Sequence, residues 1–85
     1  MTSSNVRPLL YVKTGCPWCV EAEEFLNSRG IAYDRLDVLR DPEAFARMKE
    51  LSGQTKAPTL DWDGEILADF STTELEPFLK EHGAL

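Results

Sequence analysis

Cysteine and histidine are scarce in this sequence, which has two cysteines and one histidine among 85 residues. Two cysteines are too few for the disulfide scaffold of a small secreted domain. A bridge between Cys16 and Cys19 would also close a loop too short to add much stability. A zinc site needs four ligands, and with His82 as the only histidine it would require a second chain. We therefore expect no bound metal, and a cysteine pair that serves chemistry rather than stability.

Positive charge and long apolar stretches are also lacking. Nine Lys and Arg residues stand against fifteen Asp and Glu residues, which gives a net charge of −6. A nucleic-acid partner needs a basic surface, and a membrane-spanning helix needs about 18 or more apolar residues in succession. We expect neither a nucleic-acid partner nor a membrane segment. The polar start "MTSSNVRP" does not resemble a signal peptide, so we expect a cytoplasmic protein.

The composition that remains is that of a globular domain. Hydrophobic residues make up 42% of the chain and charged residues 28%, which suits a folded soluble protein rather than a disordered one. A chain of this length is expected to form one domain, here residues 1–85. We expect residues 1–6 to be a disordered lead-in.

Local signals predict the elements of the first half of the chain. The apolar run "PLLYV" (residues 8–12) has the length of a buried strand. After the turn "KTGCP", Pro17 fits the first position of a helix, and Gly30 is a natural stop for it. The partly alternating "IAYDRLDV" (residues 31–38) is expected to form a second strand.

The second half begins with a helix that has Asp41 as its N-cap and Gly53 as its stop. "APTLDWDGEILADF" predicts two strands joined by a tight turn at the Asp-Gly pair of residues 63–64. The capping box "STTE" (residues 71–74) opens a last helix. The resulting order, β-α-β-α-β-β-α, predicts an α/β fold with a mixed four-stranded sheet and helices on both faces. Its first two strands are parallel and its closing hairpin is antiparallel.

The position of the cysteines indicates their chemistry. Cys16 lies at the end of a strand-to-helix turn, where free N–H groups and the helix dipole stabilise a thiolate. Cys19 lies one turn further on, close enough to bridge to Cys16 and less exposed. A Cys-x-x-Cys pair beside a strand-helix-strand pattern favours a redox couple over half of a metal site or two inert cysteines. Cys16 would attack a disulfide and Cys19 would resolve it, with Trp18 on the surface as part of a substrate-docking patch.

The segments "KTGCPWC" and "SGQTKAPTL", followed by a short hairpin, resemble the dithiol glutaredoxins, which have a thioredoxin-like fold. The resemblance covers residues 9–79, nearly the whole chain. It implies that Pro58 follows a cis peptide bond and packs beside Cys16. It also implies that the backbone of Ala57 hydrogen-bonds an extended substrate such as glutathione.

The same resemblance implies further binding residues. Lys13 and Gln54 match residues that hold the glycyl carboxylate of glutathione, and Lys56 would add positive charge beside Cys16. The sequence departs from the family after the hairpin, where "LADFSTTEL" lacks the usual Gly-Gly pair. Asp69 could pair with the amino group of glutathione there, and the helix start at Ser71 offers N–H groups for a carboxylate. Phe70 is either a core residue or a side chain that fills the groove and excludes glutathione.

The resemblance implies a glutathione-dependent thiol-disulfide oxidoreductase that acts on protein disulfides and glutathione mixed disulfides. It implies no bound cofactor, glutathione as co-substrate, and a monomer. The alternative is a glutaredoxin-like hydrogen donor recycled by thioredoxin reductase, which the missing Gly-Gly pair favours. A third hypothesis is an iron–sulfur carrier formed by two chains, although Pro17 after the nucleophile is unfavourable for cluster binding in that family.

Overall fold

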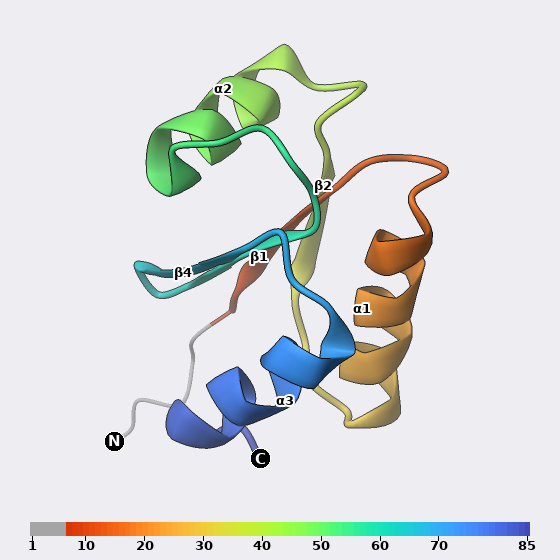
Figure 1. Cartoon of the computed structure of the whole chain (residues 1–85), viewed down its shortest axis with the longest axis vertical. Coiled ribbons are helices and arrows are strands. Elements are labelled where there is room, and N and C mark those ends of the chain that lie inside the picture. The colour runs from red at the N-terminus through yellow and green to blue at the C-terminus, as the bar shows by residue number, and fades with distance from the viewer. Residues whose placement is uncertain (1–6) are drawn as a thin grey trace.

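The computed structural model describes residues 7–85, so the disordered lead-in expected at residues 1–6 lies outside the described part of the chain. Within that part, the elements follow one another in the predicted order (Figure 1). The strands are β1 (Leu9–Val12), β2 (Asp34–Asp37), β3 (Thr59–Trp62) and β4 (Glu65–Ala68). The helices are α1 (Pro17–Ser28), α2 (Pro42–Ser52) and α3 (Thr72–Glu81).

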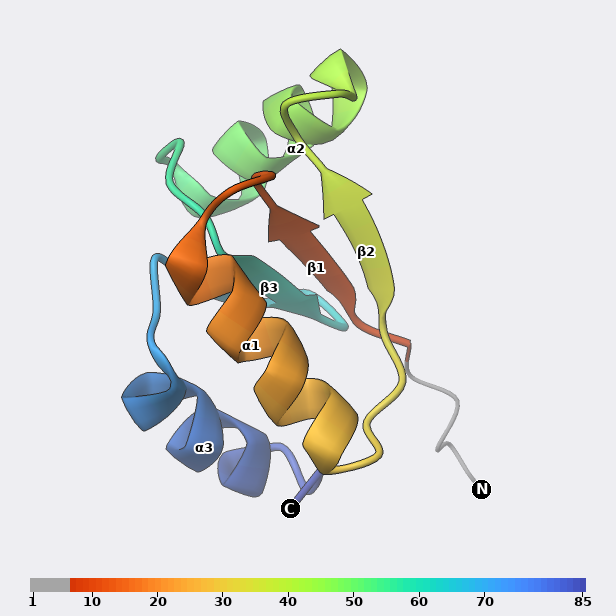
Figure 2. The same cartoon turned by 90° about the vertical axis from the view of Figure 1, so that its right-hand side faces the viewer.

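The strands form one mixed sheet in the order β2-β1-β3-β4. β1 is parallel to β2 and antiparallel to β3, and β3 is antiparallel to β4, so the predicted pairing is confirmed. Because β1 and β2 are parallel, their carboxyl ends meet at one edge of the sheet, as their arrowheads show in Figure 2. We call this the upper edge; the turn into α1, which carries Cys16, begins there.

Helices cover both faces of the sheet (Figures 1 and 2). Leu10 and Val12 of β1 point into a core that contains Leu26 of α1 and Leu75 of α3. Tyr11, between them, points to the opposite face, into a smaller core with residues of α2. β1 is therefore apolar on both faces, as expected for a strand buried between two helical layers.

The helix ends follow local sequence signals. The side chain of Asp41 accepts hydrogen bonds from the N–H groups of Glu43 (3.1 Å) and Ala44 (3.2 Å), and α2 ends at Gly53 with a φ of 72°. The predicted start of the second strand at residue 31 is wrong. After Gly30 the N–H of Ile31 still bonds the Leu26 carbonyl at 3.0 Å and closes α1, so strand pairing begins only at Asp34.

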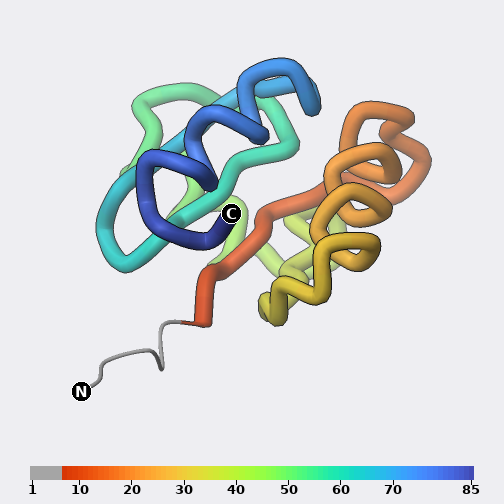
Figure 3. The backbone as a smooth tube through the Cα atoms, turned by 90° about the horizontal axis from the view of Figure 1, so that it is seen from below, coloured from red at the N-terminus to blue at the C-terminus, as the bar shows by residue number. Residues whose placement is uncertain are grey.

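The C-terminus lies at the end of the molecule away from the β1–α1 turn, as Figures 1 and 2 show. Figure 3 looks onto this lower end, with α3 and the C-terminus in front. Leu85, the last residue, is therefore remote from the upper edge that carries Cys16.

Candidate active site

The turn between β1 and α1 places the sulfur of Cys16 at the start of a helix. The Cys16 N–H donates to the Lys13 carbonyl at 3.1 Å, and Gly15 supplies the positive φ (86°) that this turn needs. Cys16 is the N-cap of α1, and Pro17 is its first helical residue. The Cys16 Sγ accepts a hydrogen bond from the Cys19 N–H at 3.3 Å, where an N-cap oxygen usually sits. Negative charge on this sulfur is therefore stabilised by the first turn of α1.

Cys19 has the opposite environment. Its side chain is only 2% exposed, whereas Cys16 is half-buried. Burial, followed by the hydrogen bond with Cys16 and the charge of that neighbour, raises the pKa of the Cys19 thiol to about 12. Cys19 is therefore a protonated thiol at neutral pH. The two sulfurs differ as an attacking and a resolving group must.

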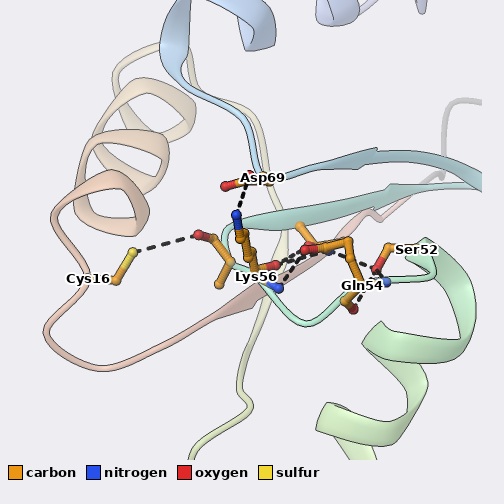
Figure 4. Close-up of polar contacts among 7 residues, drawn as sticks. Cys16, Ser52, Gln54, Lys56 and Asp69 are labelled. Atoms are coloured by element: carbon orange, nitrogen blue, oxygen red, sulfur yellow. Dashed lines mark hydrogen bonds and ion pairs between the residues drawn. The ribbon is translucent and has the colours of Figure 1, made fainter.

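The loop before β3 lies directly beside Cys16 (Figure 4). The Ala57–Pro58 peptide bond is cis, which confirms the expectation from the family resemblance. The Cys16 thiol lies 3.9 Å from the Ala57 carbonyl oxygen and donates a weak hydrogen bond to it. Ala57 and Pro58 are both buried, so this loop is a fixed wall of the site.

Gln54 has its side chain turned into its own loop. Its Nε2 donates to Ser52 Oγ (2.9 Å), the Lys56 carbonyl (3.1 Å) and Thr59 Oγ1 (3.3 Å). Its Oε1 accepts from the Lys56 N–H at 2.5 Å. Gln54 was expected to hold a glutathione carboxylate, but in the structure its amide braces the backbone that leads to the cis peptide. Gln54 therefore positions this loop, and a contact between Gln54 and glutathione stays a prediction.

Lys56 and Asp69 face each other across the site (Figure 4). Their Nζ and Oδ2 atoms are 3.9 Å apart, and both side chains are largely exposed. Asp69 has a φ of 53°, a left-handed conformation that glycine adopts more easily, and its N–H bonds the Pro58 carbonyl at 2.9 Å. The backbone at the position of the missing Gly-Gly pair thus takes a glycine-like conformation, while its side chain pairs with Lys56.

The residues around Asp69 have separate roles. Phe70 is 3% exposed and belongs to the larger core, so it does not fill a groove beside Cys16. Ser71 is the N-cap of α3, and its N–H donates to Glu74 Oε1 at 3.0 Å. The predicted capping box therefore occupies one of the N–H groups that were expected to receive a carboxylate.

Two further predicted residues flank the cysteines. Lys13 is half-buried at the end of β1, and its carbonyl supports the Cys16 turn. Trp18 is 57% exposed, so its ring lies on the surface as expected. The structure thus brings Lys13, Trp18, Lys56, Ala57 and Pro58 to the loops and helix start that carry Cys16.

A polar contact that sequence reasoning missed joins the ends of β1 and β2. The Thr14 hydroxyl donates to the Asp37 carboxylate, and this hydrogen bond lowers the pKa of Asp37 below its ordinary value. The signal was present in the sequence. Thr14 and Asp37 each lie at the carboxyl end of one of two adjacent parallel strands, so their side chains meet at the same sheet edge.

The described part of the chain shows neither a cluster of metal ligands nor a membrane-spanning helix. Residues 7–85 contain no group of three or more His, Cys, Asp or Glu side chains that could hold a metal ion. No helix among them has both the length and the apolarity that crossing a bilayer requires. Two shallow hollows lie at α2, where both are bordered by Glu43 and Arg47, on the face of the sheet opposite α1.

Comparisons with known proteins agree with this geometry. A sequence model of the Glutaredoxin family matches residues 9–67. An uncharacterized glutaredoxin-like 8.6 kDa protein in the rubredoxin operon of Clostridium pasteurianum is 29% identical over 72 residues, which cover 85% of this chain and 96% of that protein. A glutaredoxin of Neisseria meningitidis is 38% identical over 52 residues, which cover 60% of this chain and 61% of that protein.

The fold is shared with solved structures. The crystal structure of the thioredoxin-like protein BC3987 matches with a TM-score of 0.79 and 33% sequence identity, covering 86% of this chain and 100% of that chain. The thioredoxin-like fold predicted from the sequence is thereby confirmed.

Proposed function

The chain belongs to the glutaredoxin family, whose members are thiol-disulfide oxidoreductases, and we propose that Cys16 and Cys19 are its redox couple. One observation carries the proposal: the two cysteine sulfurs differ in burial and in their surroundings. Cys16 is half-buried and capped by a helix N–H, and Cys19 is buried with a raised pKa. This asymmetry suits an attacking thiolate and a thiol held in reserve.

In the proposed reaction, the Cys16 thiolate attacks one sulfur of a substrate disulfide. A Cys16–substrate disulfide forms, the substrate bond breaks, and the other substrate sulfur leaves as a thiolate. Cys19 then loses its proton and attacks Cys16 Sγ, which releases the second substrate thiolate. The substrate gains two electrons and, after protonation, two thiols, while the protein is left with a Cys16–Cys19 disulfide.

The first step also prepares the second. The charge on Cys16 and its hydrogen bond are two of the causes that raise the pKa of Cys19. Both disappear when Cys16 becomes part of a neutral mixed disulfide. Burial, the largest cause, remains, but without the other two the Cys19 proton is easier to remove in the intermediate than in the reduced protein.

We propose glutathione as the co-substrate that restores the dithiol. The cations of Lys13 and Lys56 would attract its carboxylates, the Ala57 backbone would pair with its extended chain, and Asp69 would receive its amino group. The Lys56–Asp69 pair does not oppose this. An exposed pair at 3.9 Å is worth less than about 1 kcal/mol, so the charges of a bound tripeptide can replace it. The family needs no bound cofactor for this chemistry.

The alternative is recycling by thioredoxin reductase. One contact favours it, because the Ser71 N–H at the start of α3 is already bonded to Glu74 and is not free for a glutathione carboxylate. A solved structure at 33% identity is also described as thioredoxin-like. If thioredoxin reductase recycles the protein, the dithiol chemistry of Cys16 and Cys19 is the same and only the source of electrons differs.

The deciding experiment measures recycling of the oxidised protein in two purified systems in parallel. One contains NADPH, glutathione reductase and glutathione, with a glutathione mixed disulfide as substrate. The other contains NADPH and thioredoxin reductase, with a protein disulfide as substrate. Turnover in the first system alone supports glutathione dependence, and turnover in the second alone supports the alternative. Disulfide reduction that survives in Cys16→Ser would overturn the proposed chemistry, while Cys19→Ser should retain deglutathionylation and lose reduction of protein dithiols.

We propose that the protein works as a monomer in the cytoplasm. A dithiol that donates electrons requires a reducing compartment. The measurement is sedimentation of the reduced protein, together with fractionation of the cells that make it.

A further inference from the structure

Large hydrophobic side chains are exposed at few positions among the described residues, namely Trp18, Val20, Leu39 and Leu85. Single exposed apolar side chains are ordinary in soluble proteins. However, Trp18 and Val20 lie in the first turns of α1 on either side of Cys19, and Leu39 lies in the turn that follows β2. Trp18 follows the turn that leaves β1, and Leu39 lies in the turn that leaves β2, so both come directly after the upper edge, where β1 and β2 end (Figure 2). Val20, two residues after Trp18, projects from another side of the helix.

Leu39 is the most exposed of the set, at 62%, and its turn is rigidly held. The Asp37 carboxylate accepts the Leu39 N–H at 2.9 Å, and the Asp37 carbonyl accepts the N–H groups of Arg40 and Asp41, both at 3.1 Å. A side chain on a turn held by its own backbone bonds loses little backbone freedom on binding. This lowers the cost of using it as a contact.

The same carboxylate joins the Leu39 turn to the Cys16 loop. Asp37 accepts a hydrogen bond from Thr14, two residues before Cys16, and one from the Leu39 N–H. Hydrogen bonds to a charged acceptor are the stronger kind. Leu39 is therefore held at a fixed position relative to the reactive sulfur.

We propose that Leu39, together with Trp18, forms a docking surface for the disulfide-bearing protein that Cys16 attacks, and that small disulfides do not use Leu39. This proposal rests on the proposed function. It specifies the protein substrate as one that has an apolar surface next to its disulfide. A standard protein interface covers about 800 Å² on each partner, a patch about 30 Å across. The molecule measures 34 × 25 × 18 Å, so a protein seated on Cys16 also covers the β2–α2 turn. A small disulfide contacts only the loops beside Cys16.

The test is a single-turnover experiment that needs no recycling enzyme. Reduced wild-type protein and reduced Leu39→Ser are each mixed with excess insulin, as the protein disulfide, or with bis(2-hydroxyethyl) disulfide, as the small one. Formation of the Cys16–Cys19 disulfide is followed by mass after acid quenching and alkylation. Leu85→Ser is the matched control, because Leu85 is also exposed (42%) but lies at the opposite end of the molecule. Leu39→Met is the conservative variant.

We expect Leu39→Ser to slow oxidation by insulin by about fivefold to tenfold, as the loss of an interface anchor does, and oxidation by the small disulfide by less than about twofold. Leu39→Met and Leu85→Ser should retain the wild-type rate with both substrates. Equal rates for wild type and Leu39→Ser with insulin would overturn the docking surface. So would an equal loss with both substrates, which would indicate a disturbed Cys16 loop. Wild-type protein that oxidises with neither substrate would instead refute the proposed function.

Discussion

Alkylation of the native reduced protein should modify one cysteine and spare the other. The reagent is iodoacetamide at neutral pH, which reacts with thiolates. Burial raises the pKa of the Cys19 thiol to about 12, so its thiolate fraction at neutral pH is far smaller than that of an ordinary cysteine. Its 2% exposure slows the reagent further. We expect a single adduct per chain, located at Cys16 by peptide mass spectrometry.

Cys16→Ser separates the causes of the raised pKa. This variant removes the charge of Cys16 and its thiol hydrogen bond but leaves burial, which is the largest cause. Cys19 should therefore remain unmodified in folded Cys16→Ser and become reactive once guanidinium unfolds the chain. Modification of Cys19 in the native wild type at a rate close to that of Cys16 would refute the assignment of attacking and resolving sulfurs.

The other predictions concern stability and charge. Gln54→Ala should destabilise the protein by about 1–2 kcal/mol in urea titrations, because several hydrogen bonds within the loop before β3 are lost; a change below about 0.3 kcal/mol would contradict the positioning role. Asp37→Asn should be less stable than wild type at neutral pH. Because the Asp37 pKa is depressed in the folded state, this difference should vanish as pH falls below the ordinary carboxyl value of 3.8. Above about pH 9 the unfolded chain releases the Cys19 proton before the folded protein does, so reduced wild type should lose stability towards pH 12 more steeply than Cys19→Ala. If glutathione is the co-substrate, Lys56→Met should raise KM for a glutathione mixed disulfide severalfold, and added salt should shrink the difference; no salt dependence would argue against a role for this charge.

The fold was predictable because its signals are local. The N-cap at Asp41, the stop at Gly53 and the turn at residues 63–64 each depend on residues within one turn of the chain. The start of β2 was misplaced because the alternating pattern of residues 31–33 looks like a strand, whereas the backbone there still closes α1. Periodicity alone does not distinguish a helix cap from a strand start.

The candidate site was predictable in part for the same reason. The roles of Cys16 and Cys19 depend on a helix start and one turn, both visible in the sequence. The amide of Gln54 is used in hydrogen bonds within its own loop. That arrangement depends on the path of the loop around the cis peptide, which no local sequence pattern specifies. The Lys56–Asp69 pair was missed, although the hairpin register, with Thr59 opposite Ala68, brings the residues before β3 and after β4 together.

One consequence concerns β2, which is an edge strand of the sheet. Exposed edges offer unpaired backbone groups to other chains and are a source of aggregation. The sequence of β2 is Asp-Arg-Leu-Asp. Two of its charged residues form ion pairs, Asp34 with Arg7 at 2.8 Å and Arg35 with Glu23 at 3.1 Å. If β2 paired with β2 of a second copy of the chain, the aspartate carboxylates of the two strands would come close together, and these ion pairs would lose their contact with water. With β2 at this edge of the sheet, its charged side chains therefore disfavour pairing of that edge with a second copy of the chain.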